Sequence, residues 1–164
     1  MASASDSKMR SIFPAVIHMP LPTPSGTRRN HTLSIFPDNL KFDTAGLITA
    51  VIQDTDNGDV LMVGYMDREA IARTISTRQV TFWSRSRREY WVKGESSGNT
   101  QELDRMLVDC DLDCLLVKVR QTGPACHEGY RSCFFRAVSG SDGSMEIVAD
   151  RWRAPEEMYG SASK

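Results

Sequence analysis

The sequence predicts an α+β domain that is mainly β, with one clear helix at about residues 67–77. Two apolar runs, Leu47–Gln53 and Val60–Met66, flank a turn sequence as the strands of a hairpin do. A segment at helical spacing follows, and later apolar runs occupy Leu112–Arg120 and Ser132–Val138. A chain of 164 residues is long enough for one compact domain with its own core.

The hairpin and the helix are the best defined local elements. The loop DTDNGD joins the two apolar runs, and its Asn57-Gly58 dipeptide favours a type I′ turn, in which both central residues have positive φ. Asp67 is expected to cap the helix, because its carboxylate can accept an N–H group of the first turn. The apolar face of the following segment, REAIARTIST, consists of Ala70, Ile71, Thr74 and Ile75.

The remaining strands and the domain boundaries follow from apolar runs and turn-forming residues. Val80–Ser84 returns to a strand after the helix, and Ser141-Asp142-Gly143 turns into a last strand at Met145–Ala149. Residues 1–32 include polar and proline-rich stretches, so we expect a flexible N-terminal arm there. The folded domain is expected to span residues 33–153, followed by a frayed tail at residues 154–164.

Composition and charge argue against two classes of partner. The formal net charge of −1 and the pI of about 6.3 do not favour binding to nucleic acid or to an acidic membrane. No apolar run approaches the roughly 20 residues of a membrane helix, and no signal peptide is recognisable at the N-terminus. We therefore expect a cytoplasmic protein that binds neither nucleic acid nor membrane.

The segment Asp109–Cys133 concentrates metal-capable side chains, including all four cysteines. If Val108–Leu116 is extended, three carboxylates share one face roughly 6.5–7 Å apart, and an oxygen-liganded magnesium ion would relieve their repulsion. An EF-hand is excluded, because Cys114 and Arg120 stand at its glycine and glutamate positions. A solvated acidic face remains the alternative. The three carboxylates belong to Asp109, Asp111 and Asp113.

Three of the cysteines suit a zinc site with an open position, namely Cys110, Cys126 and Cys133. They lack the C-x₂-C pairing of structural zinc sites, but three protein ligands leave the fourth position free for water. The zinc deaminase signature is absent. Cys114 adjoins two leucines and is expected to be a small core residue. Disulfides remain an alternative if the protein is exported.

His127 directly follows Cys126 in a loop bounded by glycine and proline. A histidine beside a metal-activated water can act as general acid or base. An isolated loop histidine usually has no chemical role, so the neighbouring cysteine is what favours one here. The other two histidines lie in or near the predicted arm and receive no role.

The stretch from Ser84 to Gln101 is a second candidate region, in which basic, aromatic and hydroxyl side chains alternate. Arginine forks recognise phosphate, and aromatic rings can stack on a base. A strand edge protected by arginines is the alternative interpretation. The candidate substrate-binding residues in and beside this stretch are Trp83, Ser84, Arg85, Arg87, Lys93, Glu95 and Ser97.

Taken together, these segments resemble the phosphoribosyl-AMP cyclohydrolase family of histidine biosynthesis. The resemblance covers about Leu47 to Phe134 and rests on four motifs in order: VLMVGYMDREA, FWSRSRREYWVKGESSGNTQ, DCDLDCLL and QTGPACHEGYRSCF. It implies a compact, mainly β domain that forms an intertwined homodimer. Two positions depart from the pattern of many relatives, which carry histidine in place of Asn99 and threonine in place of Glu128.

The resemblance also implies which residues hold metal. Zinc would bind Cys126 and Cys133 of one subunit together with Cys110 of the other. Magnesium would bind the three aspartates at positions 109, 111 and 113. The zinc ligands are the same three thiols that the open-site argument selects, whereas their sharing between subunits comes from the resemblance alone.

The implied reaction is hydrolytic opening of the adenine ring of 1-(5-phosphoribosyl)-AMP at the N1–C6 bond, giving the formimino-aminoimidazole carboxamide ribotide. A zinc-activated water would attack C6 while His127 shuttles the proton. Two alternatives stay open: a zinc-dependent hydrolase of another purine nucleotide, and a non-catalytic zinc-stabilised nucleotide-binding module.

Overall fold

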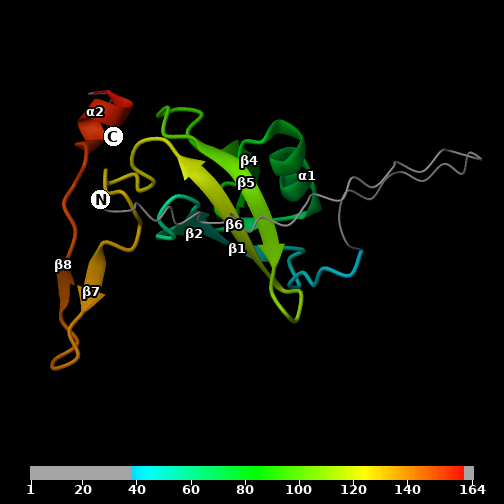
Figure 1. The fold of residues 1–164 in the computed structure, drawn as a ribbon, viewed down its shortest axis with the longest axis horizontal. Helices are drawn as coiled ribbons and strands as arrows, with labels where there is room; N and C mark the ends of the chain where they lie inside the picture. The colour runs from blue at the N-terminus through cyan, green and yellow to red at the C-terminus, as the bar shows by residue number, and fades with distance from the viewer. Residues whose placement is uncertain (1–37, 161–164) are drawn as a thin grey trace, which may run out of the picture. The chain divides into compact units, whose positions relative to one another are not determined.

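The computed structural model describes residues 38–160, which form an α+β domain in which strands predominate (Figure 1). This confirms the predicted class. The predicted arm at residues 1–32 and residues 161–164 of the predicted tail lie outside the described residues. Within the described range, eight strands and two helices follow one another along the chain.

A four-stranded mixed sheet with the order β2-β1-β6-β5 forms the centre of the fold (Figure 1). β1 pairs antiparallel with β2 and parallel with β6, and β5 and β6 are antiparallel. Parallel pairing of β1 and β6 needs a crossover connection, which residues 55–113 supply. The four strands are β1 (Ile48–Asp54), β2 (Val60–Met66), β5 (Gln101–Val108) and β6 (Cys114–Gln121).

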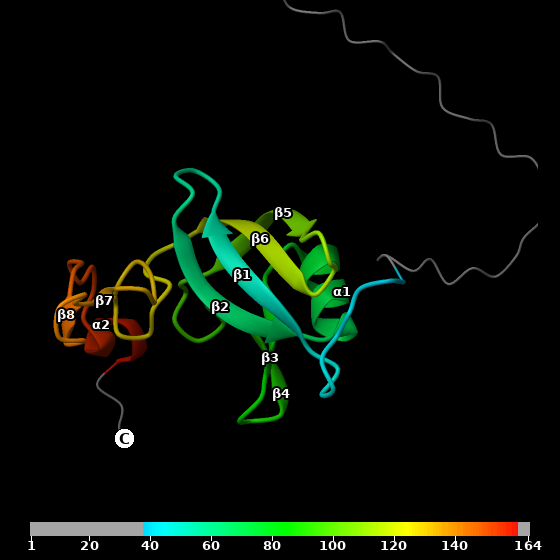
Figure 2. The ribbon, with the colours of Figure 1, turned by 90° about the horizontal axis from the view of Figure 1, so that it is seen from below.

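Helix α1 (Arg68–Thr77) packs against β2 and against β3 (Thr81–Ser84). The carboxylate of Asp67 accepts the N–H of Ala70 at 2.7 Å, which confirms the predicted cap. β3 pairs antiparallel with β4 (Glu89–Val92), and this small hairpin extends beyond the central sheet in Figure 2. Most of the largest buried apolar side chains come from α1, β3 and the central sheet, namely Ile48, Ile52, Leu61, Met66, Ile71, Phe82, Leu115, Val117 and Val119. Phe135 is buried in a second cluster with Cys126 and Tyr130.

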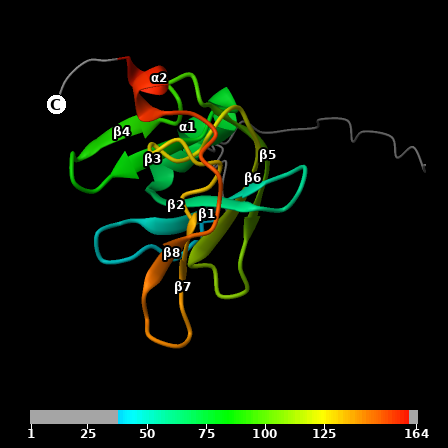
Figure 3. The ribbon, with the colours of Figure 1, turned by 90° about the vertical axis from the view of Figure 1, so that its left-hand side faces the viewer.

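The C-terminal part of the described chain adds a β-hairpin and a short helix (Figure 3). Strands β7 (Arg136–Val138) and β8 (Met145–Ile147) pair antiparallel. Helix α2 (Pro155–Tyr159) stands where a frayed tail was expected, and it is anchored because Met158 is buried. Neither helix of the described residues is long and apolar enough to span a membrane.

The β1–β2 hairpin is confirmed, but the type I′ turn predicted for it is wrong. Gly58 has a φ of 81°, whereas Asn57 does not have positive φ. The loop is longer than two residues, because Asp54 donates its N–H to the carbonyl of Asp59 at 2.8 Å. The side chains of Asp54 and Asn57 accept the N–H groups of Asp56 and Asp59, and such Asx turns stabilise the wider loop.

Two further strand predictions need correction. Residues 109–113 form a turn, so β6 begins at Cys114 and the predicted extended stretch Val108–Leu116 is interrupted. The strand predicted over Ser132–Val138 is confined to β7, because Ser132 and Cys133 donate hydrogen bonds to the carbonyls of β2 instead. β4 and β5 were not predicted, because β4 has only four residues and half of the residues of β5 are charged or polar.

Gly64 in β2 should be essential to packing, because a Cβ atom there would clash with the ring of buried Phe82. We expect Gly64→Ala to lower the free energy of unfolding by about 1–3 kcal/mol, the usual cost of overpacking a core. Urea denaturation measures this effect. Gly140→Ala is the matched control, since a Cβ at Gly140 meets no neighbouring atom within 4 Å. Equal stabilities of the two variants would contradict the expected clash.

Candidate functional site

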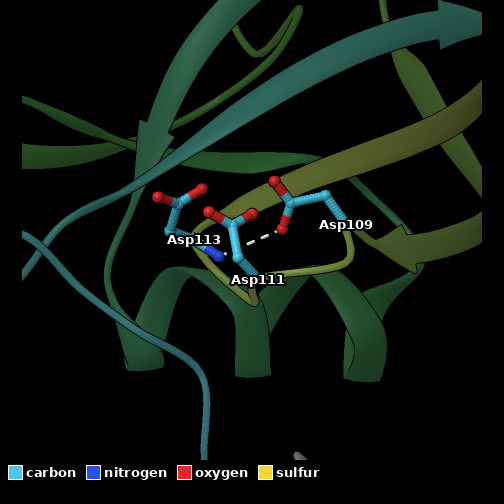
Figure 4. A group of neighbouring side chains, drawn as sticks. All are labelled: Asp109, Asp111 and Asp113. Carbon is cyan, nitrogen blue, oxygen red and sulfur yellow. Dashed lines mark hydrogen bonds between the residues drawn. The ribbon is translucent and has the colours of Figure 1, made fainter.

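The turn between β5 and β6 brings three carboxylates together. One oxygen from each of Asp109, Asp111 and Asp113 lies within 4.8 Å of the others (Figure 4). The backbone bends here because Leu112 adopts a φ of 70° and the Asp109 carboxylate accepts the N–H groups of Asp113 at 3.0 Å and Cys114 at 3.1 Å. The predicted cluster therefore forms, but through a turn rather than along one face of a strand.

The carboxylates perturb one another. Repulsion from Asp111 is the main cause that raises the pKa of Asp113, followed by partial burial and by repulsion from Asp109. The pKa of Asp109 is lowered overall. Desolvation acts to raise it, but hydrogen bonds from the backbone N–H groups of Cys114 and Asp113 stabilise the carboxylate more strongly. All three side chains are exposed. Close carboxylates that repel each other in this way can bind a metal ion with oxygen ligands.

A second candidate group lies in the loop from Cys126 to Cys133, which is held by its backbone. Cys126 donates its N–H to the carbonyl of Tyr130 at 3.1 Å, and Cys133 donates to the carbonyl of Leu61 in β2 at 2.8 Å. A left-handed Gly129, with a φ of 85°, turns the chain between these contacts. Cys133 is thereby fixed against the edge of the central sheet, and Cys126 is held within the loop.

The Cys126 and Cys133 thiols are neighbours. Burial of its thiol group is the main cause that raises the pKa of Cys133 to about 12, and interaction with Cys126 adds to the rise. Cys133 is exposed as a whole residue. Its thiol group is nevertheless crowded by neighbouring atoms, because burial of one sulfur atom does not require the whole residue to be covered. At neutral pH the Cys133 thiol is therefore protonated when no metal is bound.

Cys110 does not join this pair. Within residues 38–160 of one chain, the aspartate cluster is the one place where three His, Cys, Asp or Glu ligand atoms converge. Cys110 is exposed in the β5–β6 turn, and Cys114 is half-buried at the start of β6. Within the described residues, one chain thus brings together two of the three thiols that were predicted to bind zinc.

His127 lines a cavity of about 320 Å³ together with Lys93 and other residues from β4 and the following loop. Lys93 is only 7% exposed, and burial lowers its pKa, opposed by the nearby Cys133 and Cys126. The Lys93 side chain therefore lies near both the His127 cavity and the two thiols. Four of the predicted substrate-binding residues line this cavity, namely Arg87, Lys93, Glu95 and Ser97.

The other predicted substrate-binding residues lie elsewhere. Trp83 and Arg85 line a separate cavity of about 530 Å³ with Arg88 and Asp67. The guanidinium of Arg85 stacks on the ring of Tyr65 at 3.8 Å. Ser84 accepts the N–H of Arg87 at 3.2 Å in the β3–β4 turn. Six of the seven predicted residues are therefore divided between two cavities, and Ser84 lines neither of them.

An ion pair that the sequence analysis did not select supports the cysteine loop. Arg131 contacts the carboxylate of Asp54 at 2.7 Å and that of Asp59 at 3.3 Å. Asp54 is buried at the end of β1, so the pair joins the β1–β2 hairpin to the loop. The residues lie 77 positions apart in the chain, and no local sequence pattern indicates a contact over such a distance.

A thiol pair, a carboxylate cluster and a basic cavity with a histidine, all on a mainly β α+β domain, are features of a metal-dependent enzyme for an anionic substrate. A family model described as phosphoribosyl-AMP cyclohydrolase matches residues 62–135. The chain belongs to the phosphoribosyl-AMP cyclohydrolase family, as its motifs indicated.

Two relatives show the extent of the similarity. The chain is 61% identical over 113 residues to a phosphoribosyl-AMP cyclohydrolase of Ruegeria pomeroyi, a match that covers 69% of this chain and 94% of the relative. It is 51% identical over 123 residues to the protein of the same name from Pelotomaculum thermopropionicum, covering 75% of this chain and 95% of the relative. Both matches therefore span nearly the whole length of the relative.

Replacing Arg131 by methionine should destabilise the domain, because it leaves the buried Asp54 carboxylate without its partner. We expect a loss of about 2–4 kcal/mol in the free energy of unfolding, somewhat below the cost for a fully buried pair because Arg131 is partly exposed. Urea denaturation at one fixed protein concentration measures this loss.

Arg120→Met is the matched control for that substitution. Arg120 contacts Asp104 at 3.3 Å, but its side chain is 55% exposed, so its removal should cost less than about 1 kcal/mol. Equal losses for the two variants would show that the Arg131 pair does not anchor the loop.

Proposed function

We propose that this chain opens the adenine ring of 1-(5-phosphoribosyl)-AMP by hydrolysis of the N1–C6 bond, a step of histidine biosynthesis. The observation that carries the proposal is the 61% identity to a phosphoribosyl-AMP cyclohydrolase over 94% of that relative's length. The cavity supports it chemically, since Arg87 and Lys93 supply positive charge beside His127. We expect this activity in the cytoplasm, where four free cysteines stay reduced.

The thiol pair suits zinc, which favours sulfur and nitrogen ligands. Cys126 and Cys133 offer two neighbouring sulfur atoms in one protomer, and we propose that Cys110 of the partner subunit supplies the third. When bound there, zinc supplies Lewis-acid activation of water at neutral pH. The carboxylate cluster suits a hard cation with oxygen ligands, which we propose to be magnesium.

An exposed apolar surface supports the proposed homodimer. Beyond Cys133, hydrophobic side chains gather on the β7–β8 hairpin and the residues next to it, and several are more than half exposed. Exposed apolar patches of this kind mark protein–protein interfaces. The exposed residues in this region are Phe134, Val138, Met145, Ile147 and Val148.

The residues that line the cavity would have separate roles in the proposed reaction. The oxygen of water adds to C6 of the purine, the N1–C6 bond breaks, and C6 becomes the carbon of a carboxamide while N1 gains a proton. His127 is exposed at the cavity and would take a proton from the water and return it to N1. Arg87 and Lys93 would neutralise phosphate groups, and Ser97 would donate a hydroxyl hydrogen bond.

Cys126→Ala should abolish ring opening, because it removes one of the two neighbouring thiols. We expect turnover of 1-(5-phosphoribosyl)-AMP to fall by more than about 100-fold. Replacing residues that only contact a metal ligand already lowers metal affinity or activity by about 10–100-fold. An ultraviolet assay of ring opening, with metal content measured on the same sample, gives the result.

Cys114→Ala is the matched control, because Cys114 lies in β6 outside the thiol pair and should retain activity and zinc. Full activity of Cys126→Ala would contradict zinc-assisted hydrolysis. Release of ammonia in the assay would instead indicate deamination of the purine ring.

Zinc affinity should depend on pH in a defined direction. Because the pKa of Cys133 is raised to about 12, this thiol is protonated at neutral pH in the metal-free protein, and zinc must displace the proton. Affinity should therefore weaken as pH falls, with about one proton or more released for each zinc bound. Calorimetry in buffers of different ionisation enthalpy counts the protons. An affinity that stays constant from about pH 6.5 to 8.5 would contradict this assignment of ligands.

A further inference from the structure

The C-terminal segment of the described chain is attached to the cysteine loop. Trp152 and Arg153 donate their N–H groups to the carbonyl of Gly129 at 2.9 and 3.2 Å. Arg151 pairs with Tyr130 in an isolated β-bridge, and its guanidinium lies over the tyrosine ring at 5.2 Å. A Cβ atom at Gly129 would clash with the carbonyl oxygen of Arg153, so the two backbones approach as closely as glycine permits.

Helix α2 continues from this segment and packs on the loop that follows β4. Met158 is 7% exposed and Asn99 is 3% exposed, and the Asn99 amide nitrogen lies 3.2 Å from the Met158 sulfur. A Cβ atom at Gly123 would also clash with the Asn99 side chain. Asn99 therefore joins three segments: its own loop, the start of the cysteine loop, and α2.

These contacts bring Tyr159 to the cavity that contains His127. Tyr159 lines this cavity together with Trp91 and Lys93, although it stands 32 positions beyond His127 in the sequence. It is 46% exposed, so its ring is not needed to fill the core. Across residues 38–160, no aromatic ring or cation is found stacked on Tyr159, whereas Trp91 already stacks on Phe82 at 4.8 Å.

We propose that Tyr159 is a substrate-binding residue and that α2 forms a wall of the catalytic cavity, with the tyrosine ring stacked on the purine of the substrate. This inference rests on the proposed function for the identity of the substrate. His127 must reach the N1–C6 edge of the purine, so the base occupies the cavity that Tyr159 lines. A flat ring with an open face is suited to stack on a base.

The test compares AMP binding to full-length variants by calorimetry, so that it does not require turnover. Tyr159→Ala should weaken AMP binding by about tenfold or more, as loss of one base–aromatic stack does. Tyr159→Phe keeps the ring and should bind AMP at least about fivefold more tightly than Tyr159→Ala. Glu156→Ala is the matched control on an exposed position of α2 and should bind AMP as the unsubstituted protein does. Equal melting temperatures would confirm that the fold is retained.

Three outcomes would overturn the inference: AMP binding unaffected by Tyr159→Ala, equal weakening by the alanine and phenylalanine variants, or no AMP binding by the unsubstituted protein. Turnover separates this inference from the proposed function. With active protein, Tyr159→Ala should raise KM for 1-(5-phosphoribosyl)-AMP by about tenfold and change kcat much less. If the unsubstituted protein binds AMP but opens no ring, the proposed reaction fails while the AMP comparison still decides the role of Tyr159.

Discussion

The contact between Arg131 and the buried carboxylate of Asp54 joins the cysteine loop to the β1–β2 hairpin. Asp54 ends β1, and Arg131 lies between Cys126 and Cys133, so one ion pair fixes the cysteine loop to the central sheet. Breaking a buried pair leaves an uncompensated charge, and this cost opposes movement of the loop. The positions of the neighbouring thiols depend on this anchorage. A hydrogen bond to β2 and the turn at Gly129 also support the loop.

The central sheet positions the carboxylates in a different way. β5 and β6 form an antiparallel hairpin, and the tight turn between them forces Leu112 into the left-handed region. The turn gathers three like charges without burying them, so their mutual repulsion is moderated by water and by backbone N–H groups. A divalent cation would remove that repulsion, so the cluster could bind a metal ion.

One protomer contains only part of the site that the proposed reaction requires. Cys110 lies apart from the other two thiols, and the predicted substrate-binding residues are divided between two cavities. The exposed apolar side chains near β7 and β8 are the surface that we propose for contact with a second copy. The proposed homodimer and the proposed zinc site therefore depend on each other, because the third thiol would come from the second copy.

Short-range patterns in the sequence were enough to predict the β1–β2 hairpin, the capped helix α1 and the metal-capable side chains of the Asp109–Cys133 segment. These features follow from short-range periodicity, capping and side-chain type. Three others became visible only in the folded chain: the contact of Arg131 with Asp54, the separation of Cys110 from the other thiols, and the presence of Tyr159 in the His127 cavity. Such contacts join residues far apart in the chain, and packing rather than local propensity selects them.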